Sequence, residues 1–179
     1  MKRIAFFVFA LAFVVITACN KEEETVSFEF SHDYEFTMTE DSISIDTTLA
    51  LISTDIKSML KEQSEQNNSL ISLVQEVHLV SVVIEAVDPA TQKLSFLQDA
   101  ELFVTSGTLS ELMVASKNPV STTEGVSMSF DVEEGVDVIQ YLKNTNFKFR
   151  VSFHLRNKLA QATKFKITGT FKAVAGVDK

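Results

Sequence analysis

The chain of 179 residues has no tryptophan, one cysteine, two tyrosines, two prolines and five glycines. A single cysteine cannot form a disulfide within the chain, so the stability of the fold has to come from a hydrophobic core. The scarcity of tryptophan and tyrosine argues against a carbohydrate-capture module, because such modules rely on exposed aromatic platforms. There is no proline- or glycine-rich linker and no internal repeat. We therefore expect one domain over residues 26–176.

The chemical motifs of common enzymes are missing as well. The sequence contains no HExxH, no paired CxxC, no GxSxG and no glycine-rich phosphate loop. We therefore predict no catalytic residue, no metal site and no cofactor.

The amino-terminal segment has the pattern of a secretory signal. Lys2 and Arg3 precede thirteen apolar residues, 4–16, which are fewer than the roughly 20 that cross a bilayer as a helix. The run ends in Ile16-Thr17-Ala18-Cys19, and these four positions resemble the lipobox of bacterial lipoproteins. The resemblance implies a signal peptide over 1–18 and an acylated Cys19, which anchors the protein to a membrane through its acyl chains. The alternative is an ordinary signal peptide or an anchor helix whose cysteine is incidental.

Residues 19–25 form an acidic tether, in which Asn20-Lys21-Glu22-Glu23-Glu24 directly follow the cysteine. This run is similar to the export signal that sends lipoproteins of the Bacteroidota to the outer face of the outer membrane. The resemblance implies a protein anchored in the outer membrane at the cell surface. The alternative is a solvated, extended tether on an anchor that faces the periplasm.

Charge is distributed unevenly along the chain. Residues 19–142 hold 5 Lys/Arg and 23 Asp/Glu, whereas residues 143–179 hold 9 Lys/Arg and one Asp. The chain after the signal is acidic as a whole, which argues against nucleic acid as its partner.

Alternation of apolar and polar residues predicts strands along most of the chain. From Val26 to Met38 every second residue is apolar or aromatic, apart from His32, which indicates one half-buried strand or two joined by a bend near that histidine. Residues 77–87 are almost continuously apolar and β-branched, as in a central strand covered on both faces. Shorter strands are predicted at 43–45, 100–105, 112–116 and 126–132.

A helical insertion is expected at about 48–75. Thr47 or Thr48 can cap a helix whose apolar face holds Leu49, Ile52, Ile56, Met59 and Leu60. A further short helix is expected near 137–143.

The carboxyl end carries the clearest alternation. Its apolar positions, from Phe147 to Leu155 and from Phe165 to Ala173, predict a long β-hairpin with one apolar side. Seven or eight strands with a short helical insertion predict a mostly β fold, a two-layer antiparallel β-sandwich that is immunoglobulin-like or related. An open barrel is the alternative architecture.

The outward face of this hairpin is basic and forms the main candidate for a binding site. Its cations are Lys148, Arg150, Arg156, Lys164 and Lys166. Such a stripe can hold an anionic ligand, for example lipid A phosphates or an acidic polysaccharide. The alternative is internal neutralisation by the acids of strand 26–38, because terminal strands often lie side by side.

Other polar residues form smaller candidates. The histidines, His32, His78 and His154, lie on strands without partners at metal-ligand spacing, and His32 is expected to be a satisfied core or rim residue. The acids Glu40, Asp41 and Asp46 favour a solvated turn over a calcium loop. Two triplets, Asp41-Ser42-Ile43 and Asp46-Thr47-Thr48, resemble the O-glycosylation acceptor motif of Bacteroidota, which implies Ser42 and Thr47 as acceptors.

These features favour a non-enzymatic, lipid-anchored, extracytoplasmic protein that binds or scaffolds a protein or glycan partner at the outer membrane. A second hypothesis is a module that binds an anionic ligand through the basic hairpin. A third is a hydrolase that uses carboxylates such as Asp131, Glu133 and Glu134, although neighbouring acids on a turn do not indicate a cleft.

Overall fold

The computed structural model describes residues 24–39, 46–52, 56–107, 109–144 and 146–177, of which 46–52 by their backbone alone. The strands in these ranges form two antiparallel sheets with the orders β1-β9-β3-β6 and β2-β8-β4-β5-β7. The first sheet comprises β1 (Thr25–Met38), β9 (Thr163–Gly176), β3 (Val74–Asp88) and β6 (Ser127–Ser129). The second comprises β2 (Asp46–Ile52), β8 (Phe147–Leu155), β4 (Leu97–Ser106), β5 (Leu109–Lys117) and β7 (Asp131–Val132).

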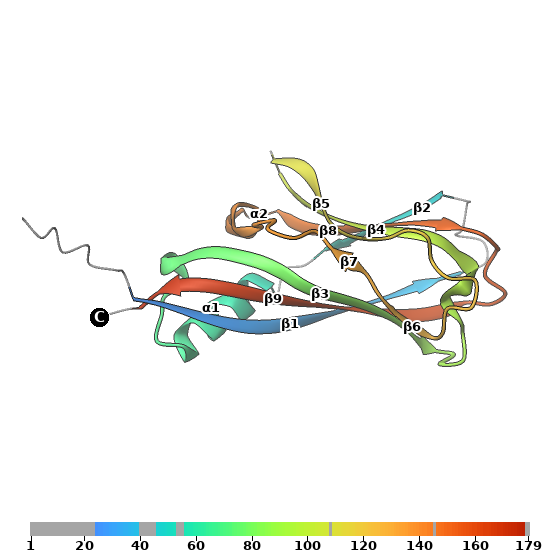
Figure 1. The fold of residues 1–179 in the computed structure, drawn as a ribbon, viewed down its shortest axis with the longest axis horizontal. Coiled ribbons are helices and arrows are strands. Elements are labelled where there is room, and N and C mark those ends of the chain that lie inside the picture. The colour runs from blue at the N-terminus through green and yellow to red at the C-terminus, as the bar shows by residue number, and fades with distance from the viewer. Residues whose placement is uncertain (1–23, 40–45, 53–55, 108, 145, 178–179) are drawn as a thin grey trace, which may run out of the picture.

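The two sheets lie on top of each other as the layers of a sandwich (Figure 1). The helical elements are α1 (Ile56–Gln66), α2 (Ile139–Lys143) and the short 3-10 turns η2 (Ile71–Leu73) and η3 (Leu94–Phe96). The mostly β, two-layer antiparallel sandwich with a short helical insertion is therefore confirmed.

The alternation in the sequence correctly predicts which side chains face the core. In β1 the buried and half-buried positions are the apolar and aromatic ones and His32, and the strand continues through His32 without a bend that divides it. The apolar positions of β8 and β9 are buried along the whole length of both strands. Because both sheets turn their apolar faces inward, one core forms between them.

The predicted carboxyl-terminal hairpin is wrong. β8 pairs with β2 and β4, whereas β9 pairs with β1 and β3 in the other sheet. Residues 156–162 therefore carry the chain across the sandwich, and the apolar faces of β8 and β9 lie opposite each other. A hairpin and a crossover of this kind show the same alternation, because alternation reports the buried side of a strand and not its neighbours.

The predicted start of the helical insertion is also wrong. Residues 46–52 pair with β8 as strand β2, and helix α1 begins at Ile56. Leu49 and Ile52 fit a helical spacing, but Leu49 and Leu51 fit a strand equally well. The backbone hydrogen bonds available along β8 decide between the two. The strand predicted at 43–45 lies outside the described residues.

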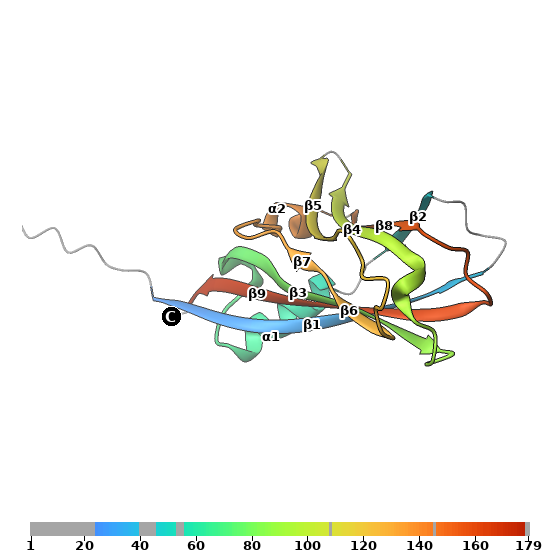
Figure 2. The same ribbon diagram turned by 45° about the vertical axis from the view of Figure 1, so that its right-hand side comes forward.

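Two further strands differ from expectation. β3 is covered on one face only, and Val80 and Val87 on its other side are 41% and 37% exposed. A register irregularity between Leu79 and Ser81 accommodates one extra residue there. The predicted strand 126–132 divides into β6 on the first sheet and β7 on the second, and Figure 2 shows the chain rising between them.

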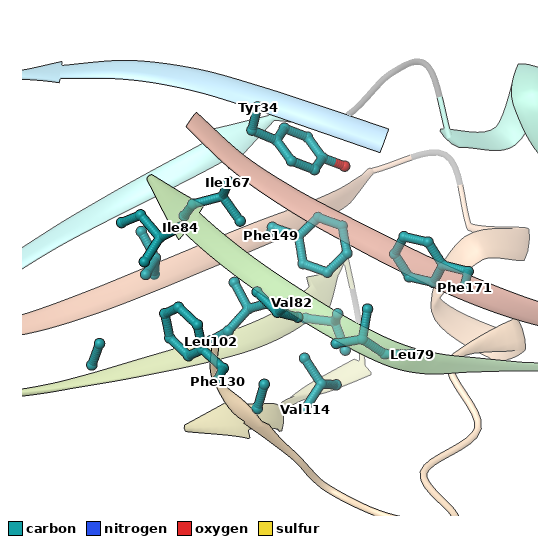
Figure 3. Packing of buried hydrophobic residues seen from close by; sticks show 14 of the residues in the cluster. Tyr34, Leu79, Val82, Ile84, Leu102, Val114, Phe130, Phe149, Ile167 and Phe171 are labelled. Carbon is teal, nitrogen blue, oxygen red and sulfur yellow. The ribbon is translucent and has the colours of Figure 1, made fainter. Parts of the chain in front are cut away.

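Aromatic rings fill the space between the sheets. Phe149 of β8 contacts Phe171 of β9, with ring centroids 5.9 Å apart, and Tyr34 of β1, at 5.4 Å. Figure 3 shows these rings together with Ile167 from the first sheet and Leu102 from the second. An apolar cavity of about 10 Å³ lies here, lined by Tyr34, Leu79, Leu102, Phe149, Ile167 and Gly169. Each fully buried phenylalanine stabilises the fold by about 1.5–3 kcal/mol.

The described chain starts and ends at the same end of the sandwich. The backbone N–H of Val177 donates to the Glu24 carbonyl at 3.0 Å, and Ser69 Oγ donates to the Gly176 carbonyl at 2.6 Å. We call this the tether end. β1 extends over 14 residues, so the opposite, distal end lies about 45 Å away at roughly 3.3 Å per residue.

Candidate functional site

The five basic residues predicted as an anion site do not form one surface. Because β8 and β9 belong to different sheets and face each other across the core, their outward side chains point to opposite sides of the sandwich. Lys148 and Arg150 lie on the outer face of the second sheet. Lys164 and Lys166 lie on the outer face of the first, and Arg156 follows the distal end of β8.

Two of the three lysines of β9, Lys164 and Lys166, are neutralised by acids on the neighbouring strands. Lys164 Nζ lies 2.6 Å from Glu35 Oε2 on β1. Lys166 Nζ lies 2.7 Å from Glu85 Oε1 on β3 and 3.9 Å from Asp33 Oδ2 on β1. The hydrogen bond to Glu85 raises the pKa of Lys166. The alternative of internal neutralisation is thus confirmed for Lys164 and Lys166.

Arg150 is held by a carboxylate and an aromatic ring. Its Nε and Nη2 atoms donate to the two carboxylate oxygens of Glu111 on β5, each at 2.5 Å. Its guanidinium carbon lies 4.0 Å from the centroid of the Phe103 ring on β4. The hydrogen bond from Arg150 lowers the pKa of Glu111, and the same bond raises the pKa of Arg150. Arg150 is therefore part of the sheet surface and already engaged by an anion of the same chain.

Arg156 and Lys148 complete the set. Arg156 donates from Nη1 to the Ser95 carbonyl at 2.9 Å and from Nη2 to the Val120 carbonyl at 3.0 Å. Its guanidinium thereby links η3 to the loop that follows β5. Lys148 is exposed on the face of β8.

A polar cluster lies at the side of the sandwich. Here residues 133–138, which follow β7 of the second sheet, run to the edge of β3 in the first sheet and hydrogen-bond to it. We call residues 133–138 the side strap. Its ends are fixed by backbone hydrogen bonds from Glu133 N to the Val114 carbonyl, at 3.0 Å, and from Val138 N to the Val77 carbonyl, at 2.8 Å. Asp137 Oδ1 accepts from the backbone N–H of Val77 and of Ile139, both at 2.9 Å.

His78 is the side chain of β3 that meets this strap. Its Nδ1 lies 3.0 Å from the Val136 carbonyl oxygen, and its Nε2 lies 3.2 Å from Glu76 Oε2. The hydrogen bond to Glu76 is the largest contribution that raises the pKa of His78, and Asp137 adds to it, while desolvation opposes both. Lys172 is opposite His78 in the register of β9.

The other two histidines are satisfied within the fold. His32 Nδ1 lies 3.0 Å from Met59 Sδ of α1, and the His32 ring meets the Tyr34 ring edge-on. It is half-buried, in agreement with the expected core or rim position. His154 is bonded through Nδ1 to Asp99 Oδ1, and Asp99 is 8% exposed.

The remaining candidates are dispersed. Asp131 lies 3.4 Å from Lys117 Nζ, and Glu133 and Glu134 are exposed at the start of the side strap. Within the described ranges, no three His, Cys, Asp or Glu side chains are grouped so as to hold a metal ion. No helix in those ranges is long and apolar enough to cross a membrane. Cys19, Ser42, Glu40 and Asp41 lie outside the described residues, and Thr47 pairs with Phe153 in β2.

Comparison with known proteins gives no family. No family model matches the sequence, and no curated protein matches it. Among the solved structures that match is one of turnip yellow mosaic virus, with 11% sequence identity over 100% of this chain and 92% of that chain and a TM-score of 0.32. Another is of desmodium yellow mottle tymovirus, with 7% identity over 100% of this chain and 98% of that chain and a TM-score of 0.26. The VP2 subviral particle of infectious bursal disease virus gives 12% identity over 88% of this chain and 38% of that chain, with a TM-score of 0.31. Similarities of this level carry no argument about function.

Sequence reasoning missed the cluster of His78, Glu76, Val136 and Asp137. Its parts are about 60 residues apart in the chain, and the side strap has no periodic pattern. The one local signal is Asp137, because an aspartate side chain often accepts the backbone N–H two residues on, as Asp137 does from Ile139.

Proposed function

We propose that this protein is a lipid-anchored, extracytoplasmic lipoprotein that binds or scaffolds a partner at the outer membrane and catalyses no reaction. The observation that carries the proposal is the ordered combination of Lys2 and Arg3, the apolar run 4–16 and the four residues that end in Cys19. Acyl chains on Cys19 give stable membrane attachment, because two chains suffice for it whereas one binds only reversibly.

The position of β1 supports this proposal. Thr25, the first residue of β1, follows Cys19 by six residues, which span at most about 20 Å when fully extended. On this proposal the tether end stays within about 20 Å of the membrane, and the distal end, about 45 Å away along β1, is the part that can reach farthest from it. The loops at the distal end, 89–93, 118–126 and 156–162, are the parts of this surface best placed to meet a partner.

The anchor is tested by metabolic labelling of the full-length chain with an alkyne fatty acid in a Gram-negative host. We expect a labelled, membrane-bound product whose mass fits cleavage before Cys19, and loss of both label and membrane association in Cys19→Ser. A product that keeps residues 1–18, or carries no acyl mass, would falsify the anchor.

Surface exposure and the absence of turnover need separate tests. Replacement of Lys21, Glu22, Glu23 and Glu24 by alanine should reduce cleavage of the protein by protease added to intact cells, while labelling of Cys19 stays unchanged. Equal cleavage of both forms would remove the role of the tether in export.

Turnover of glycosidic, ester or peptide substrates by the detergent-solubilised mature protein would contradict the proposal that the protein catalyses no reaction.

A further inference from the structure

His78 faces two hydrogen-bond acceptors and no donor in its two ring contacts. One is the Val136 carbonyl oxygen at 3.0 Å from Nδ1, and the other is the Glu76 carboxylate at 3.2 Å from Nε2. A neutral imidazole carries one N–H and one lone pair, whereas the imidazolium carries two N–H donors. Both contacts are therefore hydrogen bonds only when His78 is protonated.

The deprotonated ring leaves one of these contacts unfavourable. If Nδ1 keeps its proton, the lone pair of Nε2 points at the Glu76 carboxylate. If Nε2 keeps it, the lone pair of Nδ1 points at the Val136 carbonyl. Deprotonation thus weakens either the bond to the strap or the bond to the strand that positions the ring.

The charged groups around His78 favour the protonated form. Glu76 is on β3 itself, and Asp137 comes from the side strap. Lys172, at the paired position on β9, is the one cation among these neighbours. The raised pKa of His78 agrees with this balance.

The strap covers a part of the core. Val77 and Val138 are fully buried, and Ile139 is 3% exposed. Between Glu133 and Val138 the strap has Gly135 with φ of 74°, a left-handed conformation that glycine adopts without strain. Where the strap separates from β3, the Val77 N–H loses its Asp137 acceptor and the edge of β3 becomes accessible to solvent.

We propose that His78 is a proton-operated clamp, which holds the side strap on β3 while the imidazole is charged and loosens it when the proton is lost. The inference concerns a local opening and is independent of the anchor and of the partner.

The direction of the pH dependence follows from linkage. The clamped state binds the proton more tightly than the open state, whose histidine has an ordinary pKa near 6.5. The extra stability of the clamped strap is therefore fully present below about pH 6.5. It is lost, and with it the protection of the strap amides from hydrogen exchange, as the pH rises through the higher pKa of the clamped state. The total fall is about tenfold for each unit by which the clamped pKa exceeds the open one.

Amide hydrogen exchange of the mature protein tests this clamp. NMR measures protection at Val77 and Val138 between pH 5.5 and 8.5, with each rate divided by the intrinsic rate at that pH. Phe153, in the middle of β8, serves as the reference amide. We expect protection at the first two amides to fall with rising pH while that of Phe153 stays constant. Equal loss at all three would mean that the strap does not open separately, and the clamp would be rejected.

Two variants and a control identify the group that titrates. His78→Gln should abolish the pH dependence and fix protection near the high-pH value of the natural protein. Glu76→Gln should move the transition to lower pH, because it removes the carboxylate but leaves Val136. His154→Gln, which changes the histidine bonded to Asp99 on the second sheet, should leave the transition in place. Persistence of the transition in His78→Gln, or imidazole ¹⁵N shifts that show His78 neutral at pH 6.5, would overturn the proposal.

Discussion

At the scale of single residues, Gly169 is a core position without a side chain. It points inward in the middle of β9, between the buried side chains of Ile167 and Phe171. A glycine inside a strand brings no side chain to the core and loses more backbone freedom on folding than any other residue. A Cβ at this position would lie 3.4 Å from Phe171 Cε2 and 3.7 Å from Leu79 Cδ1, which are ordinary contact distances. The apolar cavity of about 10 Å³ is lined by Gly169 itself.

Gly169→Ala should therefore stabilise the protein by about 0.5–1 kcal/mol, through a less flexible unfolded chain and a better filled core. Urea denaturation measures the change. Gly176→Ala is the matched control, because Gly176 is in the same strand but outside the cavity, and its effect should be the smaller one. Destabilisation by Gly169→Ala would mean that the strands cannot accept the added methyl group.

At the scale of elements, helix α1 has a well-defined end. Asn68 has φ of 54°, the left-handed conformation that often follows the last turn of a helix. The Ser69 N–H donates to the Ser64 carbonyl at 2.9 Å, and the Asn68 N–H donates to the Glu65 carbonyl at 3.2 Å. These two bonds make a Schellman motif, which satisfies carbonyls that have no partner within the helix.

The conformation of Asn68 predicts opposite effects for two small substitutions. Asn68→Gly should be neutral or stabilise by up to about 0.5 kcal/mol, whereas Asn68→Ala should destabilise by about 1 kcal/mol, because alanine is strained at positive φ. Thermal unfolding followed by circular dichroism measures both. Asn67→Gly is the control, since the positive φ is at Asn68 and not at Asn67. A stabilising Asn68→Ala would show that this helix end is not left-handed in solution.

The type of each element, strand or helix, could be predicted where the apolar residues repeat with a single spacing. Alternation over 26–38 and 147–155 identified strands and their buried side chains, because period 2 is incompatible with a helix there. Residues 48–52 fit both periods, and only their pairing with β8 makes them a strand. The α1 helix was predicted correctly from Ile56 onward, since Ile56 and Leu60 lie one turn apart on its buried side.

At the scale of the whole molecule, the sequence could not predict which strands share a sheet. The chain changes sheet six times, after β1, β2, β3, β5, β6 and β8, and none of these crossings alters the alternation of buried residues. The basic site depended on that assignment, so its residues were predicted to lie on one face but occupy two. Neutralisation of Lys164 was predictable, because it requires only that the first and last strands are neighbours. The nearest partner of Lys166 is Glu85 of β3, whose place beside β9 the sequence did not show.

These crossings have a consequence for stability. Neither sheet has a core of its own, since the rings that fill the interior come from both. Phe36 of β1 stacks with Phe153 of β8 at 6.0 Å, and Phe149 of β8 contacts Phe171 of β9 at 5.9 Å. Loss of either sheet therefore exposes the apolar face of the other, and the two layers should unfold as one cooperative unit.

This cooperativity is measurable with one core substitution in each layer. Phe153→Leu, in the second sheet, and Phe171→Leu, in the first, should each lower the free energy of unfolding by about 1–2 kcal/mol, because each leaves a partly filled space in the core. Far-UV circular dichroism follows all strands, and tyrosine fluorescence in a Tyr141→Phe background follows Tyr34 of the first sheet alone. Both signals should give the same midpoint in each variant, even when the substitution is in the opposite layer. A fluorescence midpoint that moves with Phe171→Leu but not with Phe153→Leu would show that the layers unfold separately, and the core would then not be shared.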